Sequence, residues 1–187
     1  MSTTIANHYL LTKRAGLAAS TGKALTARAC TVRLFEAGIW PLWTATRNRR
    51  RIAGGDHVAV YLAGNGLSCM AGLATVAIVE RWSSRHLAHY PLVLDGTPEA
   101  VLRLSDTTLF NVPVPAKPML GALDLFAGGV PLKWGVYFMG GCRAISEHDF
   151  DVLTGRASTR RGDVVFEAGE THRQGFAEQQ QEHSDHA

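Results

Sequence analysis

One short segment of the chain combines large aromatic residues, cations and an amide: Trp40, Trp43, Arg47, Asn48, Arg49, Arg50 and Arg51. An indole ring offers a flat face on which a nucleobase can stack, which contributes roughly 1 to 3 kcal/mol per base. Guanidinium groups contact phosphates, and an amide can both donate to and accept from the edge of a base. The segment therefore indicates nucleic-acid binding. The alternative is that the tryptophans belong to the core and the arginines to a solvated loop.

The distribution of charge also points to a polyanionic partner. The 187 residues include 19 Lys and Arg and 16 Asp and Glu, a formal net charge of +3. Residues 167–187 hold five acids against Arg173, a net −4, so residues 1–166 carry 18 bases against 11 acids, a net +7. Lys13 and Arg14 add to the cations that could contact a nucleic-acid backbone. An ordinary surface with a solubilising acidic tail accounts for the same numbers equally well.

Several classes of function lack their motifs. The sequence contains no GxxxxGK[ST] loop, dinucleotide fingerprint, GxSxG elbow or HExxH pattern. His86 and His89 form the best candidate metal pair, although a solvated loop explains them better. Three widely spaced cysteines argue for a reducing compartment, and no apolar run approaches the roughly 18 to 20 residues of a membrane span. We expect a cytoplasmic protein that is not an enzyme, is not in a membrane, and uses no cofactor or metal.

Hydrophobic periodicity and turn residues predict the elements that position this segment. Strands are predicted at 8–13, 39–46, 57–63, 70–81, 101–110, 112–114 and 136–138. Helices are predicted at 26–38, 118–126 and 147–153, with Thr26 and Ser146 as caps. Gly64-Asn65-Gly66 reads as a hairpin loop, and Gly72 inside a strand suggests a bulge or a close backbone approach. Strands dominate with few crossover units, which favours an α+β domain with a small mixed or closed sheet.

The chain divides into one packed unit and a tail. Residues 1–155 contain no internal linker or repeat, so they are predicted to form one domain. Residues 156–187 are polar and acidic, and they hold too few apolar side chains to offset the entropy lost on ordering. We expect this tail to be largely disordered, apart from a short strand at 163–166.

The order and spacing of several short motifs resemble the EVE domain, a relative of the YTH domain within the PUA-like superfamily. The motifs are the strand His8–Leu11, Gly38-Ile39-Trp40 with Asn48 eight residues later, Gly55-Asp56 leading into Val58–Tyr61, and the strand Ala71-Gly72-Leu73-Ala74. Trp134, Gly140-Gly141 and a helix at His148-Asp149-Phe150 resemble the end of such a domain. The resemblance covers about residues 6–155.

This resemblance implies a small mixed β-barrel flanked by helices, with an aromatic cage that accepts one modified base flipped out of a nucleic-acid strand. YTH domains read N6-methyladenine in RNA, and prokaryotic EVE domains are associated with modified cytosines in DNA. Pro41-Leu42 stands where YTH domains have a small polar residue, which is a departure from the methyladenine pattern. The expected ligand is therefore modified DNA, 5-methylcytosine for example, with a nuclease or restriction enzyme as a possible partner.

Carried over to this sequence, Trp40 matches the first wall of the cage. Trp82 and, less closely, Trp134 are the candidates for the second wall, and Asn48 lies near a polar position of the family. The predicted pocket is thus Trp40, Trp43, Asn48, Tyr61, Trp82 and Trp134. The predicted backbone contacts are Lys13, Arg14, Arg47, Arg49, Arg50 and Arg51.

Two other classes of function stay open at this point. A PUA-like enzyme similar to ASCH proteins, acting on RNA or nucleosides, would need polar groups in the pocket, for which Lys13, Tyr61 and Glu80 are available. A protein-interaction domain would instead use the aromatic segment to dock a partner chain.

Overall fold

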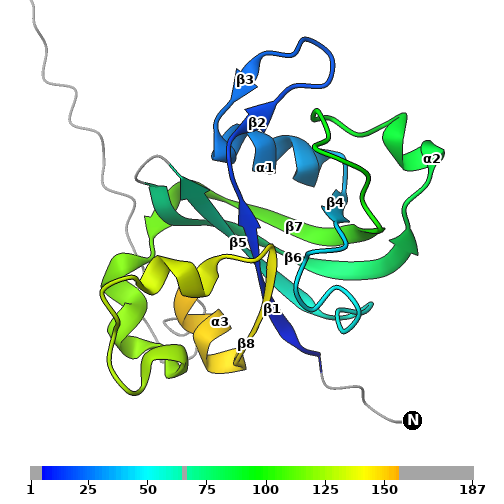
Figure 1. Cartoon of the computed structure of the whole chain (residues 1–187). Coiled ribbons are helices and arrows are strands. Elements are labelled where there is room, and N and C mark those ends of the chain that lie inside the picture. The colour runs from blue at the N-terminus through cyan, green and yellow to red at the C-terminus, as the bar shows by residue number, and fades with distance from the viewer. Residues whose placement is uncertain (1–5, 65–66, 156–187) are drawn as a thin grey trace, which may run out of the picture.

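The computed structural model describes residues 6–64 and 67–155, which form a curled six-stranded sheet (Figure 1). The strand order is β4-β7-β6-β5-β1-β8. The bounds are β1 His8–Lys13, β4 Ile39–Leu42, β5 His57–Gly64, β6 Leu67–Arg81, β7 Ala100–Pro115 and β8 Cys142–Ile145. Strands β1 and β5 run parallel, and the other neighbours are antiparallel. The mixed sheet flanked by helices confirms the predicted α+β fold class.

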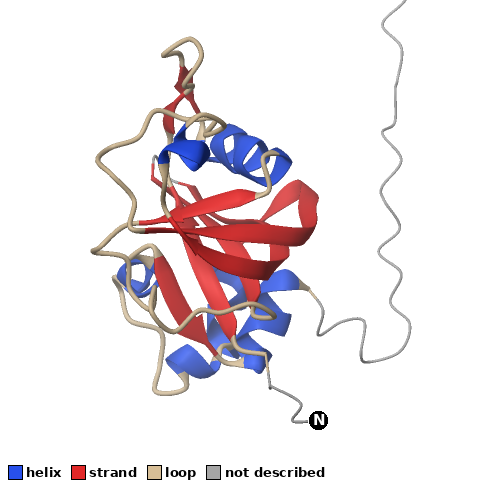
Figure 2. Ribbon diagram, turned by 90° about the vertical axis from the view of Figure 1, so that its right-hand side faces the viewer, coloured by secondary structure: helices blue, strands red, loops and turns tan. Residues whose placement is uncertain are grey.

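Helices cover both faces of this sheet (Figure 2). They are α1 Ala27–Glu36, α2 Ser84–Leu87 and α3 Glu147–Thr154, with 3-10 helices at Lys117–Ala122, Asp124–Phe126 and Trp134–Phe138 and a small hairpin of β2 Gly16–Leu17 and β3 Ala24–Leu25. The hydroxyl of Thr26 accepts a hydrogen bond from the amide of Ala29, and Ser146 does the same for Asp149. Both predicted helix caps are therefore confirmed.

Alternation along the strands separates two hydrophobic clusters. In β5, Val58, Val60 and Leu62 belong to the first cluster, under α1, whereas Ala59 and Tyr61 belong to the second, under α3. Successive side chains of a strand point to opposite faces, so neighbours in sequence lie on different sides of the sheet. Any site on the α1 side is thereby separated from any site on the α3 side.

Gly72 allows the backbones of the two longest strands, β6 and β7, to lie unusually close together where they pair. The pairing of β6 with β7 shifts register between Met70 and Gly72. A Cβ atom on Gly72 would lie 2.3 Å from the carbonyl oxygen of Thr108 and 3.3 Å from the ring of Phe35. The predicted close backbone approach is confirmed, and α1 packs directly over it.

The structure corrects one predicted strand, adds a strand that was not predicted, and leaves other predictions untested. Residues 134–138 form a 3-10 helix rather than a strand, because the backbone turns there with Val136 and Met139 donating to the carbonyls of Lys133 and Val136. The sixth strand, β8, was not predicted, because four residues of mixed polarity give no clear period. The hairpin tip at 65–66 and the strand at 163–166 lie outside the described residues, and the domain boundary after 155 stays a prediction.

None of the helices in the described part of the chain has the length and apolarity that crossing a membrane requires.

Cys142 in β8 predicts a specific pH dependence of stability. Burial, with a smaller contribution from the neighbouring Asp56 carboxylate, raises the pKa of this thiol from 9.0 to about 12. Between these values the unfolded chain loses the proton and the folded chain keeps it, so the free energy of unfolding falls as pH rises. We expect the free energy of unfolding of Cys142→Ala to fall less steeply with pH than that of the wild type, by up to about 1.4 kcal/mol per pH unit. Urea unfolding of both proteins at pH 8.5 to 10.5 measures the two slopes. Equal slopes for the variant and the wild type would contradict this role of Cys142.

Candidate nucleic-acid interface

A cavity of about 380 Å³ opens on the α1 side of the sheet. Its walls come from the end of β1, from β2, from the loop after β4, and from the segment that follows α2. The lining residues are Lys13, Ala15, Gly16, Leu17, Trp43, Tyr90, Leu92, Val93, Leu94 and Asp95. The volume lies within the roughly 300 to 1,000 Å³ typical of small-molecule sites, and an aromatic and aliphatic lining with few polar groups is characteristic of them.

Trp43 is held in this wall by three hydrogen bonds. Its amide donates to the hydroxyl of Thr46 at 2.9 Å, and its carbonyl accepts from the amide of Thr46 at 2.9 Å. Its indole Nε1 donates to the carbonyl of Asp95 at 3.1 Å. The ring is therefore fixed on one side of the cavity while remaining half-exposed.

Tyr90 also lines the cavity and is 6% exposed. Burial raises the pKa of its phenol well above the usual value, so the hydroxyl stays protonated. The segment after it is tied to β2, since Val93 donates to the carbonyl of Leu17 and Ala19 donates to that of Pro91. Trp82 supports Tyr90 from behind in an edge-to-face contact with ring centroids 5.6 Å apart.

Lys13 supplies a cation at the end of β1. Burial lowers the pKa of its amine, an effect partly opposed by the nearby Cys30 thiol. An ammonium group offers three hydrogen-bond donors and no acceptor. Lys13 can therefore donate hydrogen bonds to acceptor atoms of a ligand in this mostly apolar cavity, whose other charged lining residue is Asp95.

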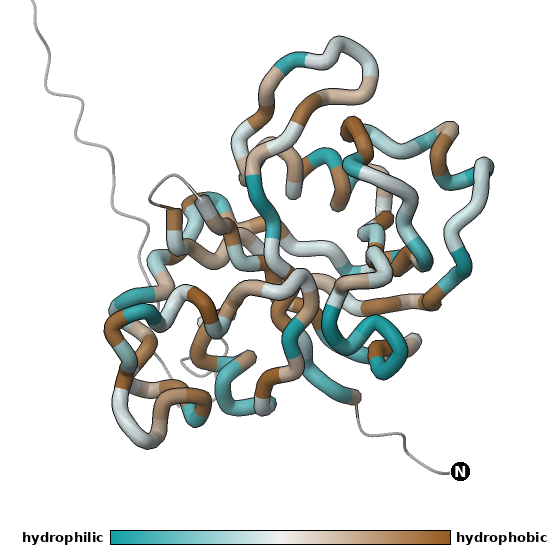
Figure 3. The backbone as a smooth tube through the Cα atoms, in the orientation of Figure 1, coloured by the Kyte–Doolittle hydropathy of each residue, from teal (hydrophilic) through white to brown (hydrophobic). Residues whose placement is uncertain are grey.

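The arginine segment follows Trp43 directly and forms the hydrophilic loop between β4 and β5 (Figure 3). Arg47, Arg50 and Arg51 are exposed, and none of them makes an ion pair with another described residue. Arg49 differs, because its Nε lies 2.7 Å from the carboxylate of Glu99, and this hydrogen bond lowers the pKa of Glu99. Three of the four arginines are thus available for phosphates.

Asn48 holds the loop rather than lining the cavity. It has a positive φ of 56°, and its carbonyl accepts from the amides of Arg51 and Ile52. Its side-chain Nδ2 donates to the carbonyl of Cys142 at 3.0 Å. The side chain of Asn48, predicted to contact a base, instead joins the loop that holds the four arginines to β8.

The other predicted pocket residues are dispersed. Trp40 points into the first cluster at 4% exposure, three residues before Trp43. Tyr61 is buried in the second cluster, with its hydroxyl 3.2 Å from that of Ser68. Trp134 packs on Phe138 in the same second cluster, with ring centroids 5.7 Å apart. Because the sheet separates the clusters, Tyr61 and Trp134 do not share a cavity with Trp43.

Of the predicted residues, Trp43 and Lys13 therefore line the same cavity. Trp82 does not line it but packs against Tyr90, which does. Sequence reasoning did not single out Tyr90, Leu92, Leu94 or Asp95. The sequence feature that could have identified them is the apolar run Tyr90-Pro91-Leu92-Val93-Leu94, which ends at the turn residues Asp95-Gly96. Arg14 is exposed and does not line this cavity, although its neighbours Lys13 and Ala15 do; it lines a different cavity together with Thr26.

The described residues contain no group of three or more His, Cys, Asp or Glu that could hold a metal ion. No protein-family model matches the sequence, and no curated protein matches it.

Solved structures do resemble this chain. Human THYN1 in complex with DNA containing 5-methylcytosine superimposes with a TM-score of 0.51 at 11% identity, covering 85% of this chain and all of that one. The DUF55 domain of human thymocyte nuclear protein 1 gives 0.51 at 16% identity, covering 80% and 97%. A YTH domain of Zygosaccharomyces rouxii in complex with N6-methyladenosine RNA gives a TM-score of 0.46 at 9% identity, covering 89% of this chain and 95% of that one. The chain has an EVE-like fold of the PUA-like class, as predicted.

Proposed function

We propose that this protein is a nucleic-acid reader that accommodates one flipped, modified base in the cavity between Trp43 and Tyr90. The observation that carries the proposal is the position of this aromatic-walled cavity directly beside exposed arginines. Thr46 holds Trp43 through two hydrogen bonds and is followed at once by Arg47. A base in the cavity and a phosphate on the arginine loop are therefore positioned by one short segment.

The energetics of this arrangement are consistent with a reader. Flipping a base out of a duplex costs a few kcal/mol, and stacking on an aromatic side chain returns roughly 1 to 3 kcal/mol. Burying one methyl group contributes about 0.8 kcal/mol more, which is a several-fold preference for the methylated base. Phosphate contacts from Arg47, Arg50 and Arg51 supply affinity that does not depend on sequence.

A modified cytosine in DNA is the proposed ligand, with 5-methylcytosine as the first candidate. The support is the shared fold with human THYN1, whose solved complex contains that base in DNA. Cytosine also presents O2 and N3 as acceptors, which suits the ammonium group of Lys13. Cytoplasmic localisation and a nuclease partner belong to the same proposal.

The proposal is tested with four oligonucleotides of one sequence. They carry 5-methylcytosine, 5-hydroxymethylcytosine, N6-methyladenine or no modification at the central position. We expect the tightest binding for a modified cytosine, measured by fluorescence anisotropy. Equal affinity for all four would contradict the reader, and turnover of RNA or an acylated nucleoside would favour the enzyme.

Lys13 predicts how this binding depends on pH. A lysine is charged below its pKa, and burial lowers the pKa of Lys13. Affinity for the modified base should therefore fall at a pH below the usual titration range of lysine, as the ammonium loses its proton. Lys13→Met should weaken binding at neutral pH and remove this alkaline decline. Unchanged profiles in the variant, from anisotropy titrations at pH 7 to 10, would exclude Lys13 from the contact.

A further inference from the structure

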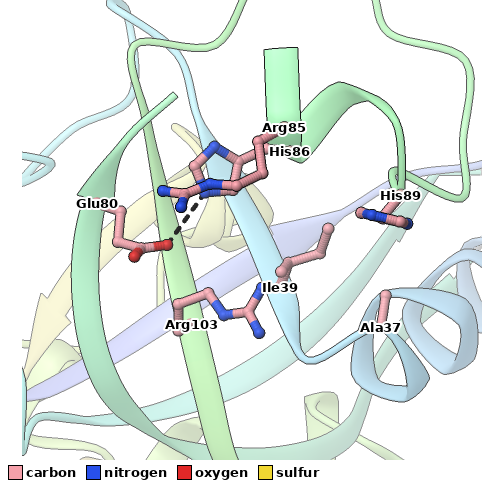
Figure 4. Close-up of a pocket in the computed structure, with 7 residues that line it drawn as sticks. All are labelled: Ala37, Ile39, Glu80, Arg85, His86, His89 and Arg103. Atoms are coloured by element: carbon pink, nitrogen blue, oxygen red, sulfur yellow. Dashed lines mark hydrogen bonds and ion pairs between the residues drawn. The ribbon is translucent and has the colours of Figure 1, made fainter. Parts of the chain in front are cut away.

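A second cavity, of about 300 Å³, lies on the same side of the sheet near α2 (Figure 4). The end of α1, the start of β4, the end of β6, α2 with the residues after it, and β7 all contribute to it. The lining residues are Ala37, Ile39, Glu80, Arg85, His86, His89 and Arg103. Ile39 and Ala37 form an apolar floor, and the other five side chains carry ionisable groups.

One carboxylate in this cavity is already engaged. His86 Nε2 lies 3.0 Å from Glu80 Oε2, and this hydrogen bond lowers the pKa of Glu80. On the other side of the ring, the amide and hydroxyl of Ser83 lie 3.1 and 2.9 Å from Nδ1. His86 is thus fixed as a buried wall of the cavity, with one oxygen of Glu80 committed to it.

The charges of two arginines also help to lower the pKa of Glu80, but neither arginine is held by it as His86 is. Arg85 comes from α2 and Arg103 from β7, both are exposed, and both line the cavity. Neither makes an ion pair with a described residue. His89 lies on the far side of the cavity from Glu80 (Figure 4). The cavity therefore holds two guanidinium groups against one carboxylate, a surplus of positive charge.

An aromatic column connects this cavity to the one around Trp43. The ring of Trp82 lies 5.5 Å from that of His86 and 5.6 Å from that of Tyr90. His86 lines the second cavity and Tyr90 lines the first. Trp82 therefore lies between a residue that lines one cavity and a residue that lines the other.

We infer that the second cavity binds a phosphate group, and that this phosphate belongs to the strand whose base occupies the Trp43 cavity. Guanidinium groups match phosphate oxygens with paired donors, which makes arginine suited to such a site. The packed rings of His86, Trp82 and Tyr90 would fix the distance between base and phosphate. That the cavity binds a phosphate rests on the cavity alone. That this phosphate belongs to the strand with the bound base rests on the proposed function.

The test is the salt dependence of binding to an unmodified single-stranded oligonucleotide. The variant R85Q/R103Q should bind about tenfold more weakly and should lower the slope of log Kobs against log salt by about 0.7 in magnitude, the value for one phosphate on a single strand. K117Q is the matched control, because Lys117 is an exposed cation on the α3 side of the sheet. Its slope should equal that of the wild type.

Inorganic phosphate alone provides the second arm, followed through the ring signals of His86 and His89 in NMR spectra. We expect these signals to shift with phosphate in the wild type and in K117Q, and not in R85Q/R103Q. A response to inorganic phosphate without a change in salt slope would overturn the assignment to the strand. No response in either arm would overturn the phosphate site. A lowered slope together with unchanged base discrimination in W43A would leave the phosphate site standing and reject the base cavity.

Discussion

Replacing Trp43 with alanine should abolish most of the affinity for a modified base. The ring forms one wall of the 380 Å³ cavity and is held there by Thr46 and Asp95. Losing one stacking face costs roughly 1 to 3 kcal/mol, which is about a 5- to 150-fold weaker Kd. The preference for the modified over the unmodified oligonucleotide should disappear at the same time. Anisotropy titrations with both oligonucleotides measure the two effects.

Two further variants distinguish the loss of the stacking face from the loss of the hydrogen bond that holds the loop. Trp43→Phe keeps an aromatic face and loses the hydrogen bond to Asp95, so it should retain most of the discrimination. Trp134→Phe alters a ring in the second cluster, across the sheet, and should bind like the wild type. Loss of discrimination in Trp134→Phe, or full discrimination in Trp43→Ala, would place the base elsewhere.

The largest effect on stability is expected from Gly72→Ala. The added Cβ would lie 2.3 Å from the backbone oxygen of Thr108, and a backbone atom in a paired strand cannot move aside as a flexible side chain can. Forcing β6 and β7 apart should lower the free energy of unfolding by about 3 kcal/mol. Urea unfolding monitored by circular dichroism measures the change through the midpoint.

Gly121→Ala is the matched control for that substitution. It adds the same methyl group where nothing lies within 4 Å of the new Cβ. Its midpoint should stay within the range of ordinary surface substitutions, about 0.5 kcal/mol. Equal midpoints for the two alanine variants would show that the close crossing of β6 and β7 does not matter for stability.

The sequence was most informative where local physics decides the structure. Strand β1 was predicted at its observed bounds, because a short run of apolar and aromatic residues is typical of a buried strand. Thr26 and Ser146 were identified as caps from residue type and position. Gly72 was predicted to mark a bulge or a close backbone approach because a glycine inside a strand pattern otherwise weakens the strand. The strand and the caps depend on neighbours in sequence, whereas the atoms that approach Gly72 belong to Thr108 and Phe35.

The candidate site was harder to predict, because the cavity joins segments that are far apart along the chain. Trp43 and Tyr90 are 47 positions apart in sequence, and both line the cavity. The hydrogen bond from the indole of Trp43 to the carbonyl of Asp95 joins the two segments. Tryptophan side chains alone did not reveal which face of the sheet each would occupy. Tyr61 and Trp134 were predicted to line the same pocket as Trp43. Both belong to the second cluster, on the other side of the sheet from the cavity.

Asn48 shows how a chemically suitable residue can serve the fold instead. Its amide could read a base edge, and the segment around it is rich in cations. Its left-handed backbone and its hydrogen bond to Cys142 instead give the arginine loop its shape. Asparagine is among the few residues that adopt this conformation at low cost, a second reason for its presence that residue type alone does not distinguish.

The contact between the base and the cavity can be observed directly by NMR. A DNA strand carrying one 5-methylcytosine provides a methyl signal from which intermolecular nuclear Overhauser effects can be measured. If the base enters the proposed cavity, this methyl group should show effects to the ring protons of Trp43 and Tyr90. A complex that forms with effects to Trp134, or with none to either wall of the cavity, would contradict the proposed reader site.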